Sequence, residues 1–485
     1  MDKDLESIQE VRTLLKQAHD AQKILAKFNQ KQIDDIVKAI AEAGYNNAEM
    51  LAKMACDETG FGKWEDKVIK NTFGSMSVYN AVRDIKTVGI IAEDREHKTI
   101  DIGTGVGVIA GIVPSTNPTS TVMYKAIIAI KGGNSIVFSP HPGAKKCILE
   151  TVKIISSAAE KAGCPQGAIS ALTIPTMPAI NELMKHELTS LILATGGAAM
   201  VKSAYSSGTP AIGVGAGNGP AFIDKSADVH MAVKRIIDSK TFDNGTICAS
   251  EQSVVVEKCM ESKVLDELKK QGAYILSGEE TERLGKFILR ANGTMNPAIV
   301  GKSAYRIAQL ANISSVPKNT SVLIAHESRV GLDAPYSHEK LAPILAFYVE
   351  NDVDSVLKRC AEILEFEGAG HTFAIHANDE ELVKKFALGV PVSRIMVNTP
   401  SALGGVGATT NLFPALTLGC GAVGGSSSSN NIGPLDVINI KRVAYGVKEL
   451  DDLRKNTSVM GTQKIDGLDE NTVEEIVKKI LEKLM

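Results

Sequence analysis

The chain has 485 residues, of which 44% are hydrophobic and 22% charged, and its formal net charge is −3. This length predicts two large domains, each able to bury its own core. The balanced charge excludes the basic surface of a nucleic-acid-binding protein, and apolar runs such as Val122–Ile130 are broken by Lys125 and too short to cross a bilayer.

The cysteines predict a reducing compartment. They form no CxxC pair and no disulfide framework, and they are Cys56, Cys147, Cys164, Cys248, Cys259, Cys360 and Cys420. The start of the sequence is acidic and polar, unlike a secretory signal peptide. No His or Cys residues stand at metal-ligand spacing. We therefore expect a cytoplasmic protein without a metal.

Residues 1–85 carry apolar side chains at helical spacing and predict helices. Thr99–Ile102 and Gly107–Val113 then predict strands. The segment from Gly105 to Ala110 matches a degenerate dinucleotide fingerprint, but a strand follows it where a helix should receive the pyrophosphate. We therefore reject this segment as a nucleotide-binding turn.

From residue 135 onward, strand-like and helix-like runs alternate, which is typical of parallel sheets covered by helices. The first block contains the strand-like Ser135–Ser139, Ala168–Leu172 and Leu188–Ala194 and the helix-like Cys147–Ala162, Met177–Lys185 and Ala198–Ser207. The second alternating block contains Ser253–Val256, the helix-like Ser262–Gln271, Ala273–Leu276, Val322–Ala325 and Ala361–Glu365. The chain then returns through Arg394–Asn398 into the Gly- and Ser-rich stretch 404–433. We expect two α/β domains.

Three segments that follow strands in the first block are candidate binding elements. Asn117 in PSTNP can donate its amide to an oxyanion, or it can start the next helix through an Asx-turn. Thr195, Gly196 and Gly197 precede a helix whose free N–H groups suit a phosphate, or they form a simple tight turn. The glycines of residues 214–218 permit close backbone approach, or they belong to an ordinary loop.

Cys248 lies in TFDNGTICAS, residues 241–250, between a polar Gly-containing turn and the apolar run 253–256. This pattern places a thiol at a loop-to-strand junction, where it can face a cleft. A thiolate attacks aldehydes and acyl groups, so the segment predicts thioacyl chemistry. The alternative is a small buried core residue.

The C-terminal part differs from the rest. Residues 452–467 are polar and non-periodic and predict a linker, whereas 468–485 predict a short amphipathic helix. Thr472 and Glu475 fit a capping box. The apolar stripe consists of Val473, Ile476, Val477, Ile480, Leu481 and Leu484. A helix this short is marginal alone in water, so the stripe needs a partner surface.

Together, in this order, these segments resemble the aldehyde dehydrogenase superfamily. The resemblance is greatest to its CoA-acylating branch, which includes the N-terminal half of bifunctional aldehyde/alcohol dehydrogenases. It covers about residues 5–450. It rests on GIVPSTNPTSTVMYKA (111–126), SPHPGAKK (139–146), ATGGAAMVKSA (194–204), GVGAGNGPAFID (213–224), TFDNGTICASEQ (241–252), EKLAPILAFY (339–348), NTPSALGGVG (398–407) and LTLGCGAVGG (416–425).

The resemblance implies an α/β fold with two doubly wound parallel-sheet domains and a small strand pair for oligomerisation. Residues 1–225, with the returning segment 415–450, would form the cofactor-binding domain, and 226–414 the catalytic domain that carries the cysteine. The strand pair is expected near 98–107 and 438–447, and it implies a homodimer or homotetramer. In this superfamily the dinucleotide lies on a five-stranded sheet without the glycine fingerprint.

The resemblance also implies roles for single residues. Cys248 would be the nucleophile, and Asn117 with the Cys248 backbone N–H would form the oxyanion hole. His371 would assist thiol deprotonation, or it is a packed or capping histidine. The implied cofactor-binding residues are Ser139 and His141 near the adenosine end, Thr195, Gly196 and Gly197 at the phosphates, Glu339 at the nicotinamide ribose, and Thr116.

One departure from the hydrolytic branch bears on the reaction. Those enzymes carry a water-activating glutamate where this chain has Val214, and valine cannot act as a base. The thioacyl enzyme should persist until the thiol of coenzyme A takes the acyl group. The implied reaction is reversible oxidation of acetaldehyde or propionaldehyde with NAD and coenzyme A. Butyraldehyde and a sulfonated aldehyde stay open, as does NADP, whose 2′-phosphate Lys145 or Lys146 could bind.

Two other functions stay open. The first is a hydrolytic aldehyde dehydrogenase, but Val214 argues against it. The second is a non-catalytic scaffold that binds a shell, but the presence of Cys248, Asn117 and Glu339 argues against it. The C-terminal helix resembles targeting peptides of enzymes inside bacterial microcompartments. A microcompartment shell protein is therefore an expected partner, with packing on a neighbouring subunit as the alternative. We expect neither a nucleic acid nor a membrane as partner.

Overall fold

The computed structural model describes residues 2–454 and 469–484. It contains two compact units, Met1–Ile91 with Gly103–Ile440 and Ala92–Ile102 with Lys441–Met485. Among the described residues, no helix has the length and apolar character needed to cross a membrane.

The N-terminal region is helical, as predicted for residues 1–85. Its elements are α1 (Lys3–Leu25), α2 (Gln30–Asn46), α3 (Ala48–Thr59), α4 (Trp64–Thr72), the π-helix η1 (Phe73–Ser77) and α5 (Val78–Val82). A capping box fixes the start of α2, because Asn29 and Gln32 exchange hydrogen bonds of 3.0 Å. Ile33, Ile36 and Ile40 then fall on the buried face of the helix.

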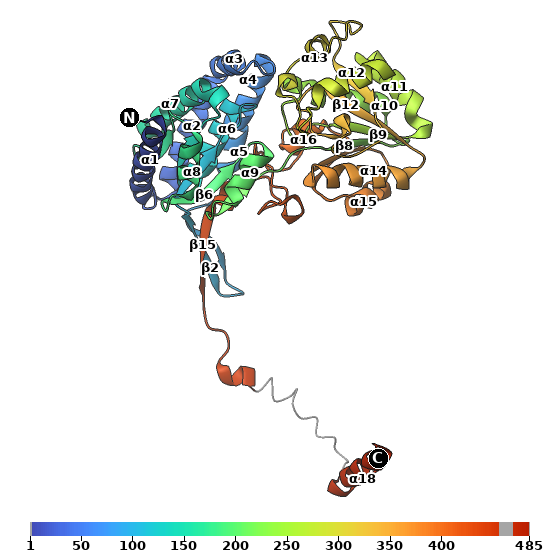
Figure 1. Ribbon diagram of the computed structural model, residues 1–485. Helices are drawn as coiled ribbons and strands as arrows, with labels where there is room; N and C mark the ends of the chain where they lie inside the picture. The colour runs from blue at the N-terminus through green and yellow to red at the C-terminus, as the bar shows by residue number, and fades with distance from the viewer. Residues whose placement is uncertain (1, 455–468, 485) are drawn as a thin grey trace. The chain divides into compact units, whose positions relative to one another are not determined.

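The first parallel sheet has the strand order β5-β4-β3-β6-β7. Its strands are β3 (Val108–Ile112), β4 (Ser135–Ser139), β5 (Ile169–Ala171), β6 (Thr189–Ala194) and β7 (Ala211–Gly213). The helices of this part are α6 (Pro118–Lys131), α7 (Lys145–Lys161), α8 (Met177–Lys185) and α9 (Ala198–Tyr205), as labelled in Figure 1, and the 3-10 turn η2 (Pro142–Ala144) precedes α7. Every residue of β3 and β4 is buried, as expected for strands covered on both faces.

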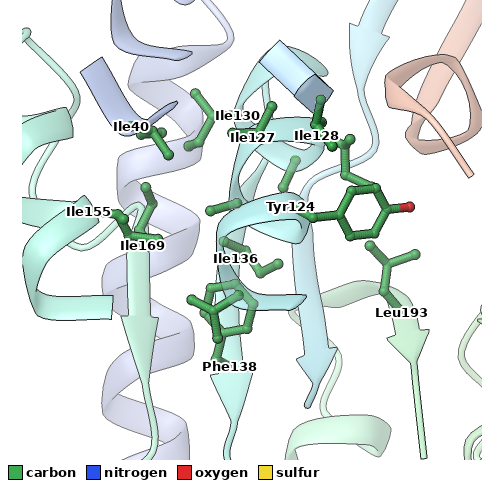
Figure 2. Packing of buried hydrophobic residues seen from close by; sticks show 14 of the residues in the cluster. Ile40, Tyr124, Ile127, Ile128, Ile130, Ile136, Phe138, Ile155, Ile169 and Leu193 are labelled. Carbon is green, nitrogen blue, oxygen red and sulfur yellow. The ribbon is translucent and has the colours of Figure 1, made fainter. Parts of the chain in front are cut away.

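The core of this part centres on α6, which is buried over its whole length. Figure 2 shows Tyr124, Ile127 and Ile128 of α6 in one cluster with Ile136 and Phe138 of β4. Because even Lys125 and Lys131 of this helix are buried, neighbours must cover it on every side. The buried position of α6 fixes the loop just before it, which carries the candidate site.

The rejected fingerprint near Gly105 is indeed not a nucleotide turn. Gly105 ends β2 (Thr99–Gly105), and β3 follows at Val108. A Cβ at Gly105 would lie 2.5 Å from the Gly133 carbonyl oxygen, so glycine is needed there for contact between two backbone segments.

The second sheet is parallel throughout, with the order β10-β11-β12-β9-β8-β13-β14. Its strands are β8 (Pro220–Ile223), β9 (Ser253–Glu257), β10 (Ala273–Ile275), β11 (Val322–His326), β12 (Ile344–Glu350), β13 (Gly370–His376) and β14 (Val392–Val397). Its helices are α10 (Val229–Thr241), α11 (Glu261–Lys270), α12 (Gly278–Ile288), α13 (Ala304–Leu310), α14 (Val353–Phe366), α15 (Glu380–Gly389) and α16 (Ser401–Gly405). Because β8 is a strand of this second sheet, the chain passes from the first sheet to the second before residue 220, whereas the predicted domain boundary lies at residue 225.

Short 3-10 turns connect these elements, and they are η3 (Phe242–Gly245), η4 (Lys258–Met260), η5 (Pro297–Ile299), η6 (Pro335–Ser337), η7 (Ala422–Gly424) and η8 (Pro434–Val437). The small third sheet has the order β1-β2-β15, with β1 at Gly89–Asp94 and β15 at Ile438–Ala444. The predicted strand pair thus gains a third strand. Arg442 binds Asp101 through two hydrogen bonds of 2.6 and 2.7 Å.

The C-terminal helix α18 spans Glu470–Leu484. The Asp469 carboxylate accepts the Thr472 N–H at 2.8 Å and the Thr472 hydroxyl at 2.6 Å, so Asp469 caps the helix. The predicted capping box of Thr472 and Glu475 is therefore wrong. The predicted apolar stripe is exposed, from 46% at Ile476 to 80% at Leu484. Of the predicted linker, residues 452–454 are helical and 455–467 lie outside the described residues.

Candidate active site

A cavity of about 240 Å³ collects most of the residues predicted for the site. Its wall is built from loops after strands of the first sheet, from the loop before β9, and from the segment before β12. The polar or glycine lining residues include Thr116, Asn117, His141, Thr195, Gly196, Gly197, Cys248 and Glu339. Loops that follow parallel strands commonly build ligand sites, so this cavity is the candidate active site.

Cys248 follows a turn with unusual backbone geometry. Asp243 and Asn244 both lie in the left-handed region, with φ of 48° and 51°. Hydrogen bonds hold the turn in place: the Asn244 amide donates to the Gly301 carbonyl at 2.9 Å, and Thr246 Oγ1 donates to Asp243 Oδ2 at 2.8 Å. A fixed turn of this kind gives the side chain of Cys248, a partly exposed residue, a defined direction.

The environment keeps the Cys248 thiol protonated at neutral pH. Burial raises the pKa of the thiol to about 12, with a smaller contribution from Glu339 where its carboxyl is ionised, whereas Arg394 acts in the opposite direction. The thiol must therefore give up its proton as it attacks, or a bound cation must lower its pKa first.

Asn117 stands at the junction between β3 and α6. It occupies the N-cap position of α6 but makes no side-chain cap hydrogen bond, so the structure contradicts the Asx-turn alternative. Its Oδ1 accepts a hydrogen bond from Lys70 Nζ at 2.6 Å, and its Nδ2 donates to the Thr246 carbonyl at 3.2 Å. The amide therefore has a fixed orientation in the wall of the cavity that also contains Cys248.

The segment Thr195–Gly197 leads into α9, which begins at Ala198 as predicted. Gly197 is the N-cap and has no side chain to cap the helix, so the leading N–H groups of α9 suit an anion. His141 also lines the cavity, and burial lowers the pKa of its imidazole. Ser139 does not line it: the residue ends β4, and its hydroxyl is buried without a hydrogen-bond partner in the described chain.

Glu339 lies against the loop that packs on the cysteine. Its Oε1 accepts the Gly217 N–H at 2.9 Å, and its own N–H donates to Glu367 Oε2 at 2.9 Å. Burial, with a further contribution from Glu367, raises the pKa of the Glu339 carboxyl to about 8. Glu339 is thus largely neutral at pH 7 and is the one carboxylic acid among the described residues that line the cavity.

His371 is placed differently from the other predicted residues. It is fully buried in β13, its Nδ1 lies 2.9 Å from Thr372 Oγ1, and its Nε2 has no hydrogen-bond partner among the described residues. Burial, together with Arg394, lowers the pKa of His371 to about 3, which makes it a weak base. These features favour the alternative of a packed histidine.

Val214 lies in the cavity wall, with 5% of its surface exposed. A branched apolar side chain neither holds nor activates a water molecule. No group of three or more His, Cys, Asp and Glu side chains in the described ranges could hold a metal ion. The cavity offers a thiol, an amide donor and a neutral acid, together with the His141 imidazole.

Sequence reasoning missed a buried charge cluster behind Asn117. Lys67 and Lys70 of α4 contact Asp243 Oδ2 at 2.8 and 2.5 Å. The lysines look like ordinary surface residues of a helix, because their partner lies more than 170 positions away in the sequence.

Comparison with known proteins identifies the family of the chain. The aldehyde dehydrogenase family model matches residues 5–310. The bifunctional aldehyde-alcohol dehydrogenase AdhE of Escherichia coli strain K12 is 45% identical over 443 residues, covering 90% of this chain and 50% of that protein. The chain thus spans about half the length of this curated relative.

Solved structures extend the likeness over most of the chain. A probable aldehyde dehydrogenase from Listeria monocytogenes EGD-e is 64% identical with a TM-score of 0.93, covering 94% of this chain and 100% of that one. An acetylating aldehyde dehydrogenase from Geobacillus thermoglucosidasius is 52% identical with a TM-score of 0.91, covering 93% and 99%.

Two more distant structures are propionaldehyde dehydrogenases. A propionaldehyde dehydrogenase from Rhodopseudomonas palustris, with bound CoA and an acylated cysteine, is 26% identical with a TM-score of 0.80, covering 90% of this chain and 97% of that one. A propionaldehyde dehydrogenase from a fucose utilisation microcompartment of Clostridium phytofermentans is 26% identical with a TM-score of 0.81, covering 91% and 98%. The chain described here belongs to the aldehyde dehydrogenase family.

Proposed function

We propose that the chain is a CoA-acylating aldehyde dehydrogenase, which converts acetaldehyde or propionaldehyde to the acyl-CoA with NAD. The observation that carries this proposal is the arrangement of Cys248, Asn117 and Val214 in one cavity. It combines a nucleophile with an oxyanion donor and lacks a water-activating base at position 214. The acetylating and CoA-bound relatives support the same reaction.

The first step is attack of the Cys248 sulfur on the aldehyde carbon. A C–S bond forms, the thiol proton goes to solvent, and the carbonyl π electrons move to the oxygen. The Asn117 amide N–H and the Cys248 backbone N–H donate to this oxyanion. Collapse of the oxyanion restores the C=O bond as a hydride leaves the carbon, and a thioester remains on Cys248.

The residues around the cavity fit a dinucleotide. The uncapped start of α9, preceded by Thr195 and Gly196, suits the phosphates, and the Glu339 carboxyl suits the nicotinamide ribose. Thr116 and His141, which line the same cavity, are proposed for the cofactor as well, and so is Ser139, which is buried at the end of β4 outside the lining. When bound, the nicotinamide of NAD supplies the acceptor for the hydride.

The acyl group then passes to coenzyme A. The CoA sulfur attacks the thioester carbon, the bond to Cys248 breaks, and the CoA thiol proton goes to solvent. Because one thioester replaces another, the reaction is reversible. Val214 leaves water without a positioned base, so the thioester on Cys248 persists until CoA arrives.

The test is NADH formation from propionaldehyde and NAD, with and without CoA, in the wild type and in Cys248→Ala. We expect steady turnover only with CoA and none in the variant. Equal turnover without CoA would replace the proposal with a hydrolytic aldehyde dehydrogenase. Repeating the assay with NADP tests the preference for NAD.

We also propose that α18 binds a microcompartment shell protein and that the sheet β1-β2-β15 joins subunits into a homodimer or homotetramer. The stripe of α18 is exposed, and its amphipathic pattern suits a groove on a partner. We expect Ile480→Glu in the full chain to abolish recruitment to shells without changing turnover. Unchanged recruitment, or a changed subunit number, would instead favour packing on a neighbouring subunit.

A further inference from the structure

Two lysines of α4 are buried behind the candidate oxyanion amide. The side chains of Lys67 and Lys70 are 3% and 4% exposed, and the Asp243 carboxylate that both contact is fully buried. Of the two, Lys70 contacts Asn117, because its Nζ donates to Asn117 Oδ1 at 2.6 Å. Lys67 instead donates to the Thr116 carbonyl at 3.2 Å.

The cluster keeps Lys70 positively charged at neutral pH. Burial lowers the pKa of Lys70 to about 8, with Lys67 contributing, whereas Asp243 and Asp66 oppose that shift. Asp66 accepts the Asp243 N–H at 2.7 Å. The nearby Cys56 thiol stays neutral, because burial raises its pKa to about 11. An ammonium group therefore faces the amide oxygen of Asn117.

The contact determines which end of the Asn117 amide faces Lys70, and Nδ2 donates on the other side to the Thr246 carbonyl at 3.2 Å and to Thr116 Oγ1 at 3.3 Å. An ammonium carries donors only, so Oδ1 rather than Nδ2 of Asn117 must face Lys70. The opposite orientation would turn the amide oxygen toward the developing oxyanion and repel it. A cation at Oδ1 also draws electron density from the amide nitrogen, which strengthens its N–H as a donor.

We propose that Lys70 is a positioning residue for the oxyanion site, which holds and polarises the Asn117 amide for any carbonyl that Cys248 attacks. The inference rests on the proposed function for the roles of Asn117 and Cys248. It does not depend on the acceptor of the hydride or of the acyl group, so it can be tested without NAD or CoA.

The test compares two electrophiles on Cys248 in the full-length protein. With p-nitrophenyl acetate, the sulfur attacks a carbonyl, an oxyanion forms, and p-nitrophenolate leaves in a burst that reports acylation. With iodoacetamide, the same sulfur displaces iodide and no oxyanion forms. We expect Lys70→Met to slow the acylation burst about 10- to 100-fold and to leave alkylation within about twofold.

Lys67→Met is the matched control, because it removes an equally buried ammonium from the same carboxylate and leaves the contact between Lys70 and Asn117 in place. We expect its burst to stay within about threefold of the wild type. Equal losses in both lysine variants, or a loss of alkylation together with acylation, would show a structural role and overturn the inference.

The Lys70→Met substitution in the Asn117→Ala variant distinguishes a positioning role of Lys70 from a role in folding. In Asn117→Ala, Lys70→Met should cause no further slowing of the burst, because the amide that it positions is gone. Additive losses would overturn the inference, as would a wild type without a burst. A wild-type burst that depends on Lys70, combined with no CoA-dependent NADH formation, would overturn the proposed function and leave this inference standing.

Discussion

Gly217 lies directly against the backbone of Cys248, so that a Cβ at Gly217 would stand 1.8 Å from the Cys248 carbonyl oxygen. The same glycine donates its N–H to Glu339 at 2.9 Å. This one residue therefore sets how closely the loop after β7, the nucleophile and the acid can approach one another.

Gly217→Ala should displace the nucleophile loop and lower turnover by about 100-fold, because small misplacements of reacting groups are costly. CoA-dependent NADH formation measures the loss, and thermal unfolding measures the accompanying strain. Gly215→Ala is the control for stability: its Cβ would have ordinary contacts of 3.7 and 3.8 Å, with Gly424 and Cys420. Equal melting temperatures for the two variants would contradict the close contact at Gly217.

Glu339→Gln should make Cys248 easier to ionise at high pH. The Glu339 carboxyl, with a pKa of about 8, is neutral at pH near 6.5 and charged at pH near 9.5, where its charge opposes formation of the thiolate. We expect alkylation by iodoacetamide to rise about 3- to 10-fold in the variant at the higher pH. At the lower pH the two proteins should react alike. Equal rates at both pH values would show that this acid does not act on the thiol.

Val214→Glu should restore release of free acid. A carboxylate at this position in the cavity wall can activate water against the thioester. We expect acid formation from the aldehyde and NAD without CoA to rise at least about tenfold, measured by product analysis. Val214→Gln has nearly the same shape without a base and should stay at the wild-type level. The same rate in both variants would contradict the account of Val214.

The sequence predicts the site residues that follow strands of the first sheet and the helix that begins after Gly197. Apolar runs there define strand ends, and ligand residues follow those ends. It does not predict β13, because His371, Thr372 and His376 interrupt its apolar pattern although all three are buried. It also places the cap of α18 three residues too late, because Asp469 and Thr472 are both suitable cap residues.

The cluster of Lys67, Lys70 and Asp243 behind Asn117 could not be predicted from the sequence. Lys67 and Lys70 resemble a solvated helix face, and only the packing of α4 on the turn at Asp243 buries them. A contact between residues so far apart in sequence leaves no local pattern. The position of the Asn117 amide could therefore be predicted from the sequence, but its orientation could be determined only from the structure.

The central claim is that the acyl group rests on Cys248 until coenzyme A takes it. Its most direct test is to measure the mass of the peptide that contains Cys248. The peptide is measured once after the enzyme has reacted with acetaldehyde and NAD without CoA, and again after CoA is added. The account predicts one acetyl group on Cys248 that persists without CoA and is removed by CoA as acetyl-CoA. An unmodified Cys248, or an acetyl group lost to water as fast as to CoA, would contradict it.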